Sequence, residues 1–272
     1  MTSVRSGATP DPSVRQWLDA LAYSSMLAAS VAGALTTAAT LALELPLLPS
    51  VIVLAICGTL VVYNIDRLRD LEYDRPHAPR RSAFIDRHRK RLGLLIILAA
   101  MVSGICALQL APAAWGLCAG VLALGLMHLR LKHIRGIKTL YLTLAWLAVV
   151  LGLPLLGSGS TAAAPSLYWI ILIMGCAIAS NLLASDFARR IPDESRRRID
   201  DRSRIGSAIV IAGLGVGTAL VGPDALRSLV LIPLAELLLL CRFREGEHYA
   251  LVVIDGALFA GACGAIMLQL FA

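Results

Sequence analysis

The stretch VIVLAICGTLVVYNIDRLRDLEYD (51–74) decides the fold, because an apolar run long enough to cross a membrane leads directly into a cluster of aspartates and arginines. The same contrast holds for the whole chain. Its 272 residues are 58% hydrophobic and 16% charged, with a mean hydropathy of +0.76, whereas soluble domains carry about 25% charged residues. The composition therefore excludes an ordinary water-soluble domain and predicts an all-α, polytopic membrane protein.

Apolar segments of about 20 residues, the length needed to cross a bilayer, recur along the chain. Residues 1–16 are rich in Ser, Thr and Pro, and we predict that they form a flexible cytoplasmic tail ahead of a membrane domain at 17–272. The six cysteines lie scattered in apolar stretches without CxxC spacing, which indicates core residues rather than disulfides or metal ligands. We predict nine transmembrane helices around a central cavity, near 17–40, 47–65, 92–110, 113–129, 139–157, 167–185, 206–222, 224–241 and 249–271.

Basic residues fall almost entirely on one side of this topology. Of the 25 Lys and Arg residues, 24 lie in the tail or in alternate connections, at 66–91, 130–138, 189–204 and 242–244. The positive-inside rule then predicts a cytoplasmic N-terminus and an external C-terminus, in a membrane of the bacterial inner (cell) membrane type. Topology and anionic lipid account for the net charge of +7, so we expect no nucleic-acid partner.

The first acidic segment contains Asp66, Asp70 and Asp74, each four residues after the last. At this spacing the three carboxylates form one stripe if the helix continues beyond the membrane, with about 40° between successive side chains. Mg²⁺ takes one or two carboxylates together with phosphate oxygens and water, so the stripe favours a Mg²⁺-diphosphate site. Arg80 and Arg81 follow and could hold remaining phosphate charge. The alternative is a solvated helix whose aspartates pair with Arg67, Arg69 and Arg75.

The second acidic segment contains Asp186 and Asp193, seven residues apart, with Pro192 disturbing the helix between them. Arg189 and Arg190 stand three and four residues after Asp186. Two interpretations remain open here: a salt bridge within the helix, or a site in which Asp186 binds metal and an arginine binds phosphate. Away from these two segments, Glu236 and Asp255 are acidic residues within the apolar spans.

A basic connection, HLRLKHIRGIKT (128–139), lies between the two acidic segments and carries Lys132, Arg135 and Lys138. The positive-inside bias explains these charges about as well as a function does. Together the three charged segments bring acidic and basic groups to one membrane face, an arrangement that suits an anionic headgroup whose chain lies among the helices.

The two acidic segments resemble those of the UbiA superfamily of intramembrane prenyltransferases. Asp70 and Asp74 match the two Asp positions of the family motif N-x-x-x-D-x-x-x-D, while Asp66 stands at the usual Asn position and Asn64 lies two places early. The run RDLEYDRPH also looks like the branch that transfers a phosphoribosyl group to polyprenyl phosphate.

The second family motif, D-x-x-D-x-x-x-D, is matched at Asp186 and Asp193, but Arg189 replaces its middle aspartate. The basic segment is similar to the family's Y-x-x-P-x-K-R…K loop, with His128 at the Tyr position and Lys132 and Lys138 at basic positions. The exchange of a carboxylate for a cation should weaken a second metal site, or replace it in part by a direct arginine–phosphate contact.

The resemblance implies a Mg²⁺-dependent enzyme that transfers an isoprenyl chain from a prenyl diphosphate to a lipophilic acceptor. The implied catalytic residues are Asp70, Asp74, Asp186 and Lys138. The implied metal ligands are Asp66, Asp70, Asp74, Asp186 and Asp193. The implied substrate contacts are Asn64, Arg75, Arg80, Arg81, Lys132, His128, Arg189 and Arg190. The alternatives are a terpene cyclase or polyprenyl-phosphate phosphoribosyltransferase of the same fold, or a non-catalytic lipid-binding or transport protein.

Overall fold

The computed structural model describes residues 12–76, 78–131, 137–159, 164–188, 198–244, 246 and 249–271, and within these ranges the chain is helical without a strand. The α-helices are α1 Pro12–Tyr23, α2 Met26–Ala42, α3 Pro49–Arg69, α4 Leu71–Asp74, α5 Pro79–Leu108, α6 Pro112–Leu131, α7 Ile137–Leu147, α8 Leu153–Ser158, α9 Ala164–Ala188, α10 Arg198–Val221, α11 Leu231–Leu240 and α12 Asp255–Phe271. Three further segments are π- or 3₁₀-helical: η1 Ala148–Gly152, η2 Asp224–Val230 and η3 Tyr249–Ile254.

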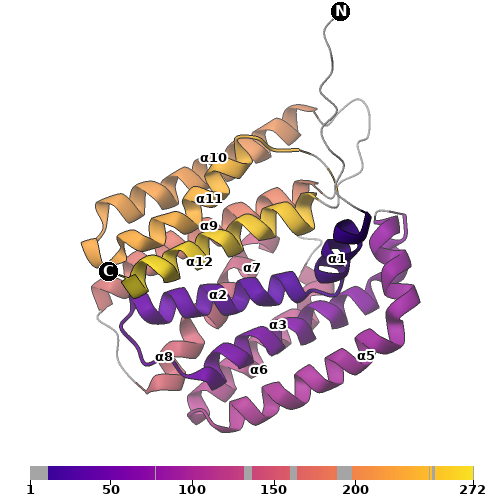
Figure 1. The fold of residues 1–272 in the computed structure, drawn as a ribbon, viewed down its shortest axis with the longest axis horizontal. Helices are drawn as coiled ribbons and strands as arrows, with labels where there is room; N and C mark the ends of the chain where they lie inside the picture. The colour runs from indigo at the N-terminus through magenta and orange to yellow at the C-terminus, as the bar shows by residue number, and fades with distance from the viewer. Residues whose placement is uncertain are drawn as a thin grey trace, which may run out of the picture.

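The long helices form a bundle in which α2 packs between α3 and α12. Figure 1 shows α10, α11, α12, α2, α3 and α5 following one another across the view, and each successive pair is in contact. The largest core cluster joins α2, α9 and α12 through side chains such as Leu35, Met174 and Leu258. Gly261 lets α12 approach α11 closely, because a Cβ there would lie 2.7 Å from the carbonyl oxygen of Leu231.

The structure bears out an integral membrane protein, but it does not confirm the predicted number of spans. A helical element lies in each of the nine predicted ranges. By length and composition, however, six helices of the described chain can cross a membrane, or seven if α1 and α2, which meet at a 70° bend, form one span. The apolar part of α6, Pro112–Gly125, is shorter, and α11 has ten residues because the preceding turns are 3₁₀-helical.

Two helices begin or bend where proline alters the backbone. Helix α1 starts at Pro12, and proline suits the first turn of a helix. Pro154 is the second residue of α8, which follows the π-helical segment η1, and proline cannot supply the helical N–H bond at its own position.

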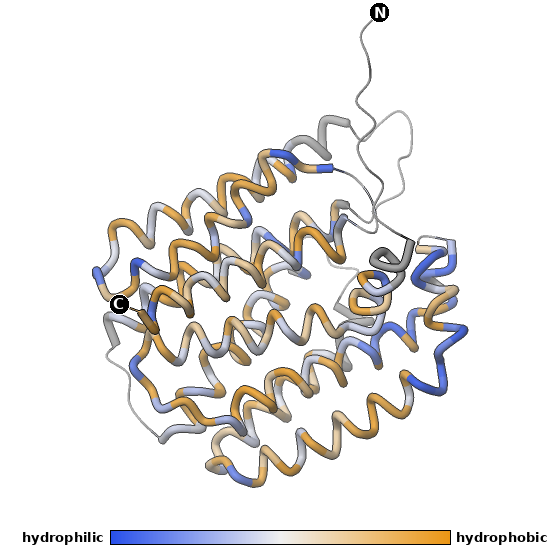
Figure 2. The backbone as a smooth tube through the Cα atoms, viewed as in Figure 1, coloured by the Kyte–Doolittle hydropathy of each residue, from blue (hydrophilic) through white to orange (hydrophobic). Residues whose placement is uncertain are grey.

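The hydrophilic residues gather at one end of the bundle (Figure 2), where α3 ends, α5 begins and α1 lies alongside. This charged end agrees with the one-sided charge of the sequence. It also places the ends of α3 and α9 and the starts of α5 and α7 at the same level of the bundle, which determines where the candidate site lies.

Candidate functional site

The three aspartates of the first acidic segment keep their one-turn spacing but do not lie on one straight helix. Helix α3 ends at Arg69, and Asp70 has φ −89° and ψ 3° before the short helix α4. The backbone N–H of Asp70 still donates to the carbonyl of Asp66 at 2.9 Å, and that of Asp74 donates to the carbonyl of Asp70 at 2.8 Å. The prediction of a continuous helical stripe is therefore wrong, although the three residues remain consecutive turns of chain.

The break after α3 follows from burial of the next apolar side chain. Leu71 is 5% exposed and packs in a cluster with Ile85 and Leu92 of α5. A straight continuation of α3 would carry Leu71 away along the helix axis, whereas the turn at Asp70 lets it reach α5. The segment thus folds back onto the bundle and keeps its aspartates near the helix ends.

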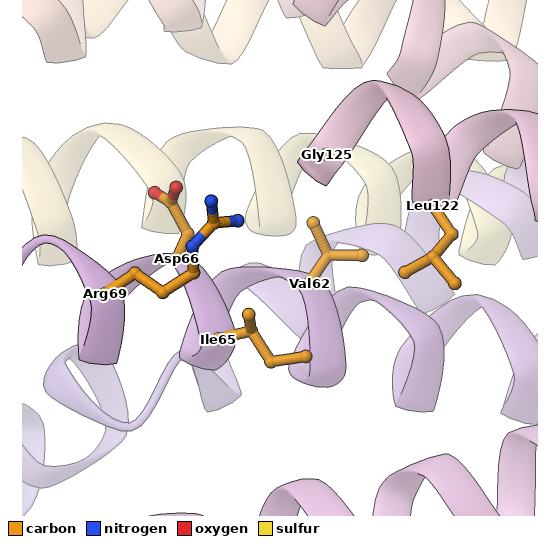
Figure 3. Close-up of a pocket in the computed structure, with 6 residues that line it drawn as sticks. All are labelled: Val62, Ile65, Asp66, Arg69, Leu122 and Gly125. Atoms are coloured by element: carbon orange, nitrogen blue, oxygen red, sulfur yellow. The ribbon is translucent and has the colours of Figure 1, made fainter. Parts of the chain in front are cut away.

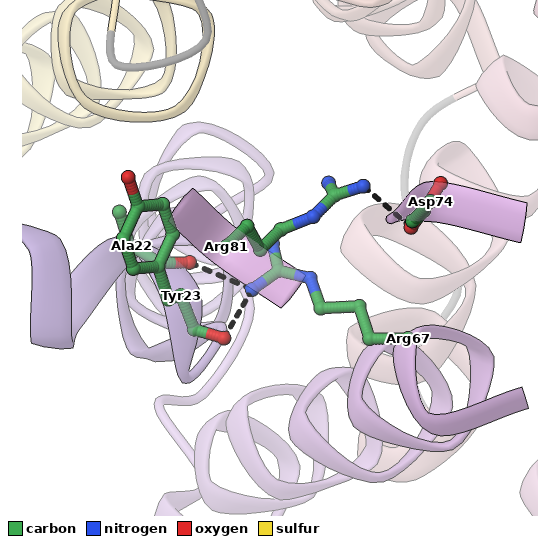
Figure 4. A network of polar contacts seen from close by, with 5 residues as sticks. All are labelled: Ala22, Tyr23, Arg67, Asp74 and Arg81. Atoms are coloured by element: carbon green, nitrogen blue, oxygen red, sulfur yellow. Dashed lines mark hydrogen bonds and ion pairs between the residues drawn. The ribbon is translucent and has the colours of Figure 1, made fainter. Parts of the chain in front are cut away.

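Asp74 is held by an arginine from the neighbouring helix α5. Its carboxylate accepts a hydrogen bond from Nη2 of Arg81 at 2.5 Å, and the two side chains are only 17% and 7% exposed (Figure 4). Arg75 lies outside in solvent-exposed pairs with Glu72 at 3.3 Å and Asp86 at 3.7 Å. The arginine that faces the acidic segment is therefore Arg81, while Arg75 and the exposed Arg80 lie farther out.

Replacing Arg81 should destabilise the charged end far more than replacing Arg75. Arg81→Gln leaves the mostly buried Asp74 carboxylate without its charged donor, so we expect a loss of about 2–4 kcal/mol in unfolding free energy. Arg75→Gln removes only exposed ion pairs, which contribute under about 1 kcal/mol. Thermal unfolding of the two variants in detergent measures the difference, and equal midpoints would contradict this role for Arg81.

Arg67 and Asn64 hold the bend between α1 and α2, a role that sequence reasoning missed. Nη1 of Arg67 donates to the carbonyls of Ala22 at 2.7 Å and Tyr23 at 2.6 Å, the last carbonyls of α1 (Figure 4). These carbonyls lie in the last turn of α1 and carry the negative end of the helix dipole, so a cation stabilises them. The sequence suggested an aspartate as the partner of Arg67, and no local pattern pointed to α1.

The amide of Asn64 is committed to the same bend. Its Nδ2 donates to the carbonyls of Ser24 at 3.0 Å and Leu60 at 2.9 Å, and its Oδ1 accepts from the hydroxyl of Ser25 at 3.5 Å. Ser25 has φ +63°, a left-handed conformation that costs energy for a residue with a side chain. Both amide hydrogens are used within the protein, so the geometry favours a structural role for Asn64 over the expected substrate contact.

The second half of the site joins α7 to α9. Nζ of Lys138 donates to Oδ1 of Asp186 at 2.6 Å, with both side chains about one-third exposed. The two residues are 48 positions apart, and both were singled out from the sequence for different reasons. The structure brings them together because the start of α7 and the end of α9 pack side by side at the charged end.

Other predicted site residues lie outside the described part of the chain. This applies to Lys132, Arg189, Arg190 and Asp193, and to the side chain of His128. Their roles stay predictions.

An aromatic pair lies between α3 and α7, farther from the charged end of the bundle than Asp66 and Lys138. Nε1 of Trp146 donates to the hydroxyl of Tyr63 at 3.1 Å, and the two rings meet edge to face with centroids 6.2 Å apart. Tyr63 is one helical turn before Asp66 on α3. On α7, Tyr141 is one turn after Lys138 and lies close enough to Asp66 to interact with it electrostatically. Asp66 therefore faces the side of α7 that carries Lys138 and the aromatic residues.

A small pocket opens between α3 and α6 on the other side of Asp66 (Figure 3). Asp66 and Arg69 lie together at its polar end, and Val62, Leu122 and Gly125 form its apolar part. A Cβ at Gly125 would lie 2.9 Å from Cγ1 of Val62, so glycine is what allows this close approach of the helices. The charged end thus continues into a small apolar pocket on the α6 side of α3.

The carboxylates fit a metal held jointly with a phosphate better than a metal held by protein alone. No group of three or more His, Cys, Asp and Glu side chains suited to a metal ion occurs among the described residues. Mg²⁺ needs only one or two carboxylates when phosphate oxygens and water complete its shell. Asp66 and Asp70 are the candidates for this role in the first segment, and Asp74 is bonded to Arg81.

These observations define an integral membrane protein that gathers acidic and basic side chains at one end of its bundle. No protein-family model and no curated protein matches the sequence. Its fold is nevertheless similar to that of a UbiA homolog from Aeropyrum pernix K1, solved in the apo state, with a TM-score of 0.62 at 12% identity, over 89% of this chain and 98% of that one. The chain has the UbiA fold, which confirms the fold that the two acidic segments indicated.

Proposed function

We propose that this protein is a membrane-embedded transferase that takes the isoprenyl chain of a prenyl diphosphate and attaches it to a lipophilic acceptor, with the charged end of the bundle facing the cytoplasm. The observation that carries the proposal is the meeting of Lys138 with Asp186 at the same end as Asp66 and Asp70, next to an aromatic-lined interior. The UbiA-like fold supports the same class of reaction.

Each group has a distinct part in this chemistry. The bond between the allylic carbon and the diphosphate oxygen breaks, and the diphosphate leaves with the electron pair. The acceptor attacks the resulting cation and gives up a proton as the new bond is completed. Lys138 stabilises the negative charge that grows on the diphosphate. Asp66 and Asp70 would hold Mg²⁺, which neutralises diphosphate charge when bound. The faces of Tyr63 and Trp146 would stabilise the carbocation, and the apolar interior would exclude water from it.

A second candidate, a protein that binds prenyl diphosphates without reacting them, is favoured by one observation. Asp74 and Asp186, both expected to bind metal, are each bonded to a basic side chain. If Asp186 also binds the metal, as the sequence predicts, the incoming Mg²⁺-diphosphate must displace Lys138 from Asp186, whereas a simple binding protein can keep the ion pair intact.

Diphosphate release distinguishes the two candidates. The purified protein is incubated in detergent with labelled prenyl diphosphates, Mg²⁺ and a membrane extract, alongside Asp70→Asn and Asp186→Asn. An enzyme should release diphosphate only with Mg²⁺, and each variant should lower the rate by at least about 100-fold. Asp224→Asn is the matched control, because Asp224 is 83% exposed and pairs with Arg227 in η2.

Thermal protection completes this test. A protein that binds but does not react should be stabilised by prenyl diphosphate and release none of it. If the protein shows no protection and no release, both functions are excluded. If release is unchanged in Asp70→Asn and Asp186→Asn, the proposed site is excluded.

A further inference from the structure

Glu236 is a completely buried carboxyl group in the half of the bundle that the proposed reaction does not use. It lies on α11 with 0% exposure, between the buried side chains of Ile232 and Leu240. Nδ2 of Asn181 on α9 donates to its Oε1 at 3.1 Å, and Asn181 is itself 6% exposed. The other oxygen, Oε2, has no hydrogen-bond partner among the described residues.

No described cation contacts Glu236 from the helices around it, although Arg244, which follows α11, is close enough to Tyr249 to interact with it. Asn181 faces it from α9, and the segment leading into α12 contributes Asp255 and Tyr249, both close enough to interact with it electrostatically. The part of α10 that packs near the end of α11 presents alanines, Ala208 and Ala212. From η2, the remaining neighbour of α11, the charged groups are Asp224 and Arg227, which are exposed and paired with each other.

An ionised carboxylate in these surroundings would be highly unfavourable. It would lack water and a counter-ion, and Asp255 would add a second negative charge nearby. A single amide hydrogen bond does not offset the loss of hydration for a charged group. The carboxyl group must therefore carry a positive charge with it, either as a bound proton or as a bound cation.

Two features favour the proton over a metal cation. The described residues hold no group of three or more side chains suited to a metal ion, and the ligands at hand here are two carboxyls and an amide whose hydrogen already points at Oε1. That hydrogen bond also indicates which oxygen of Glu236 carries the proton. Since Oε1 accepts from Asn181, the unbonded Oε2 is the one that can carry a hydrogen.

We propose that Glu236 is a proton-binding site within the membrane domain: a carboxylic acid that stays protonated on Oε2 at neutral pH, oriented by Asn181 and flanked by Asp255. This site is separate from the proposed prenyl diphosphate site and does not depend on that function. Asn181 precedes Asp186 by five residues on α9, about 7 Å along the helix, so the proton lies deeper in the bundle than the ion pair with Lys138.

The site links the stability of the bundle to pH. The folded protein binds this proton more tightly than the unfolded chain does, because unfolding returns the carboxyl group to water. The stability that this group contributes should therefore be complete only at acidic pH, below the pKa of a glutamate in the unfolded chain, about 4.3. It should decline as the pH rises above that value and level off once the proton has left the folded state. A carboxylate would then lie between α9, α11 and α12.

Infrared spectroscopy of the purified protein tests the proposal through the carbonyl stretch of a protonated carboxylic acid, which is separate from the carboxylate bands. The wild type should show this band at neutral pH, and Glu236→Gln should remove it. Asp224→Asn, which changes an exposed acid, should leave it in place. Glu236→Met is the second variant and should also remove the band. A band that persists in both Glu236 variants would overturn the proposal.

Thermal unfolding across pH provides the independent measurement. Relative to the midpoint of Glu236→Gln, the midpoint of the wild type should fall as the pH rises from acidic through neutral values, because glutamine is the neutral counterpart and keeps the bond from Asn181. The same pH series is repeated with sodium replaced by choline, which distinguishes a bound proton from a bound metal cation as the positive charge at Glu236. Sodium-dependent stabilisation that disappears in Glu236→Gln would assign the site to a metal cation and overturn the proton, as would a Glu236→Gln protein that fails to fold.

Discussion

Lys138→Met should lower the rate of diphosphate release by about 100- to 1,000-fold while leaving the protein folded. The amine of Lys138 is the basic group that the structure brings to Asp186, and in the proposed reaction it faces the charge that develops on the diphosphate. Methionine keeps the length of the side chain and removes only the charge. The fold should survive, because an ion pair that is one-third exposed contributes about 1 kcal/mol or less.

The measurement is single-turnover diphosphate release with saturating prenyl diphosphate and Mg²⁺. Lys90→Met is the matched control, since Lys90 is an exposed lysine on α5 that carries no proposed role. Lys138→Arg should retain part of the rate, because a cation remains near Asp186 with a different shape. If Lys138→Met and Lys90→Met release diphosphate equally fast, Lys138 does not contact the reacting group.

Arg67→Met should lower the free energy of unfolding by about 2–4 kcal/mol. The substitution removes two short charge-assisted hydrogen bonds to the carbonyls of Ala22 and Tyr23, two residues that are less than 5% exposed. Methionine still covers the apolar surface that the stem of the arginine covers. The loss therefore reports the anchoring of α1 rather than a cavity.

Thermal unfolding and limited proteolysis in detergent measure this effect. Cleavage within α1 should become faster in Arg67→Met, since the helix loses its main polar attachment to α3. Arg87→Met, on an exposed position of α5, should change neither property. An unfolding midpoint that is the same in Arg67→Met and the wild type would show that α1 is held by its apolar contacts with Phe84 and Leu251 instead.

Sequence reasoning located the candidate site but mistook the roles of some of its residues. The charged end, Asp186 and Lys138 could be found because charges are rare in an apolar chain and each therefore stands out. Asn64 was assigned to substrate on the strength of its neighbours, whereas its amide closes the bend at Ser24 and Ser25. Motif matching cannot distinguish these roles, because a polar residue near a helix end can face either a ligand or the backbone of another helix.

Contacts between residues that are distant in the chain also could not be predicted from the sequence. For Arg67 the sequence offered pairing with an aspartate only as an alternative, and the structure shows Arg67 bound to the end of α1. Asp74 is bonded to Arg81 across a turn that the helical pattern did not show. Trp146 and Tyr63 lie 83 residues apart and carried no signal in either span. Such contacts depend on how whole helices pack, which the local periodicity of each helix does not encode.

The sequence by itself determined that this chain spans a membrane with its charge at one end, because an apolar span can be satisfied only inside lipid and a charge only outside it. Tertiary structure decided which charges meet. The burial of Leu71 turned the chain at Asp70 and interrupted the stripe of aspartates, and the packing of α7 against α9 joined Lys138 to Asp186. The reason is physical: hydropathy is a property of each segment, whereas an ion pair needs two segments fixed at one distance.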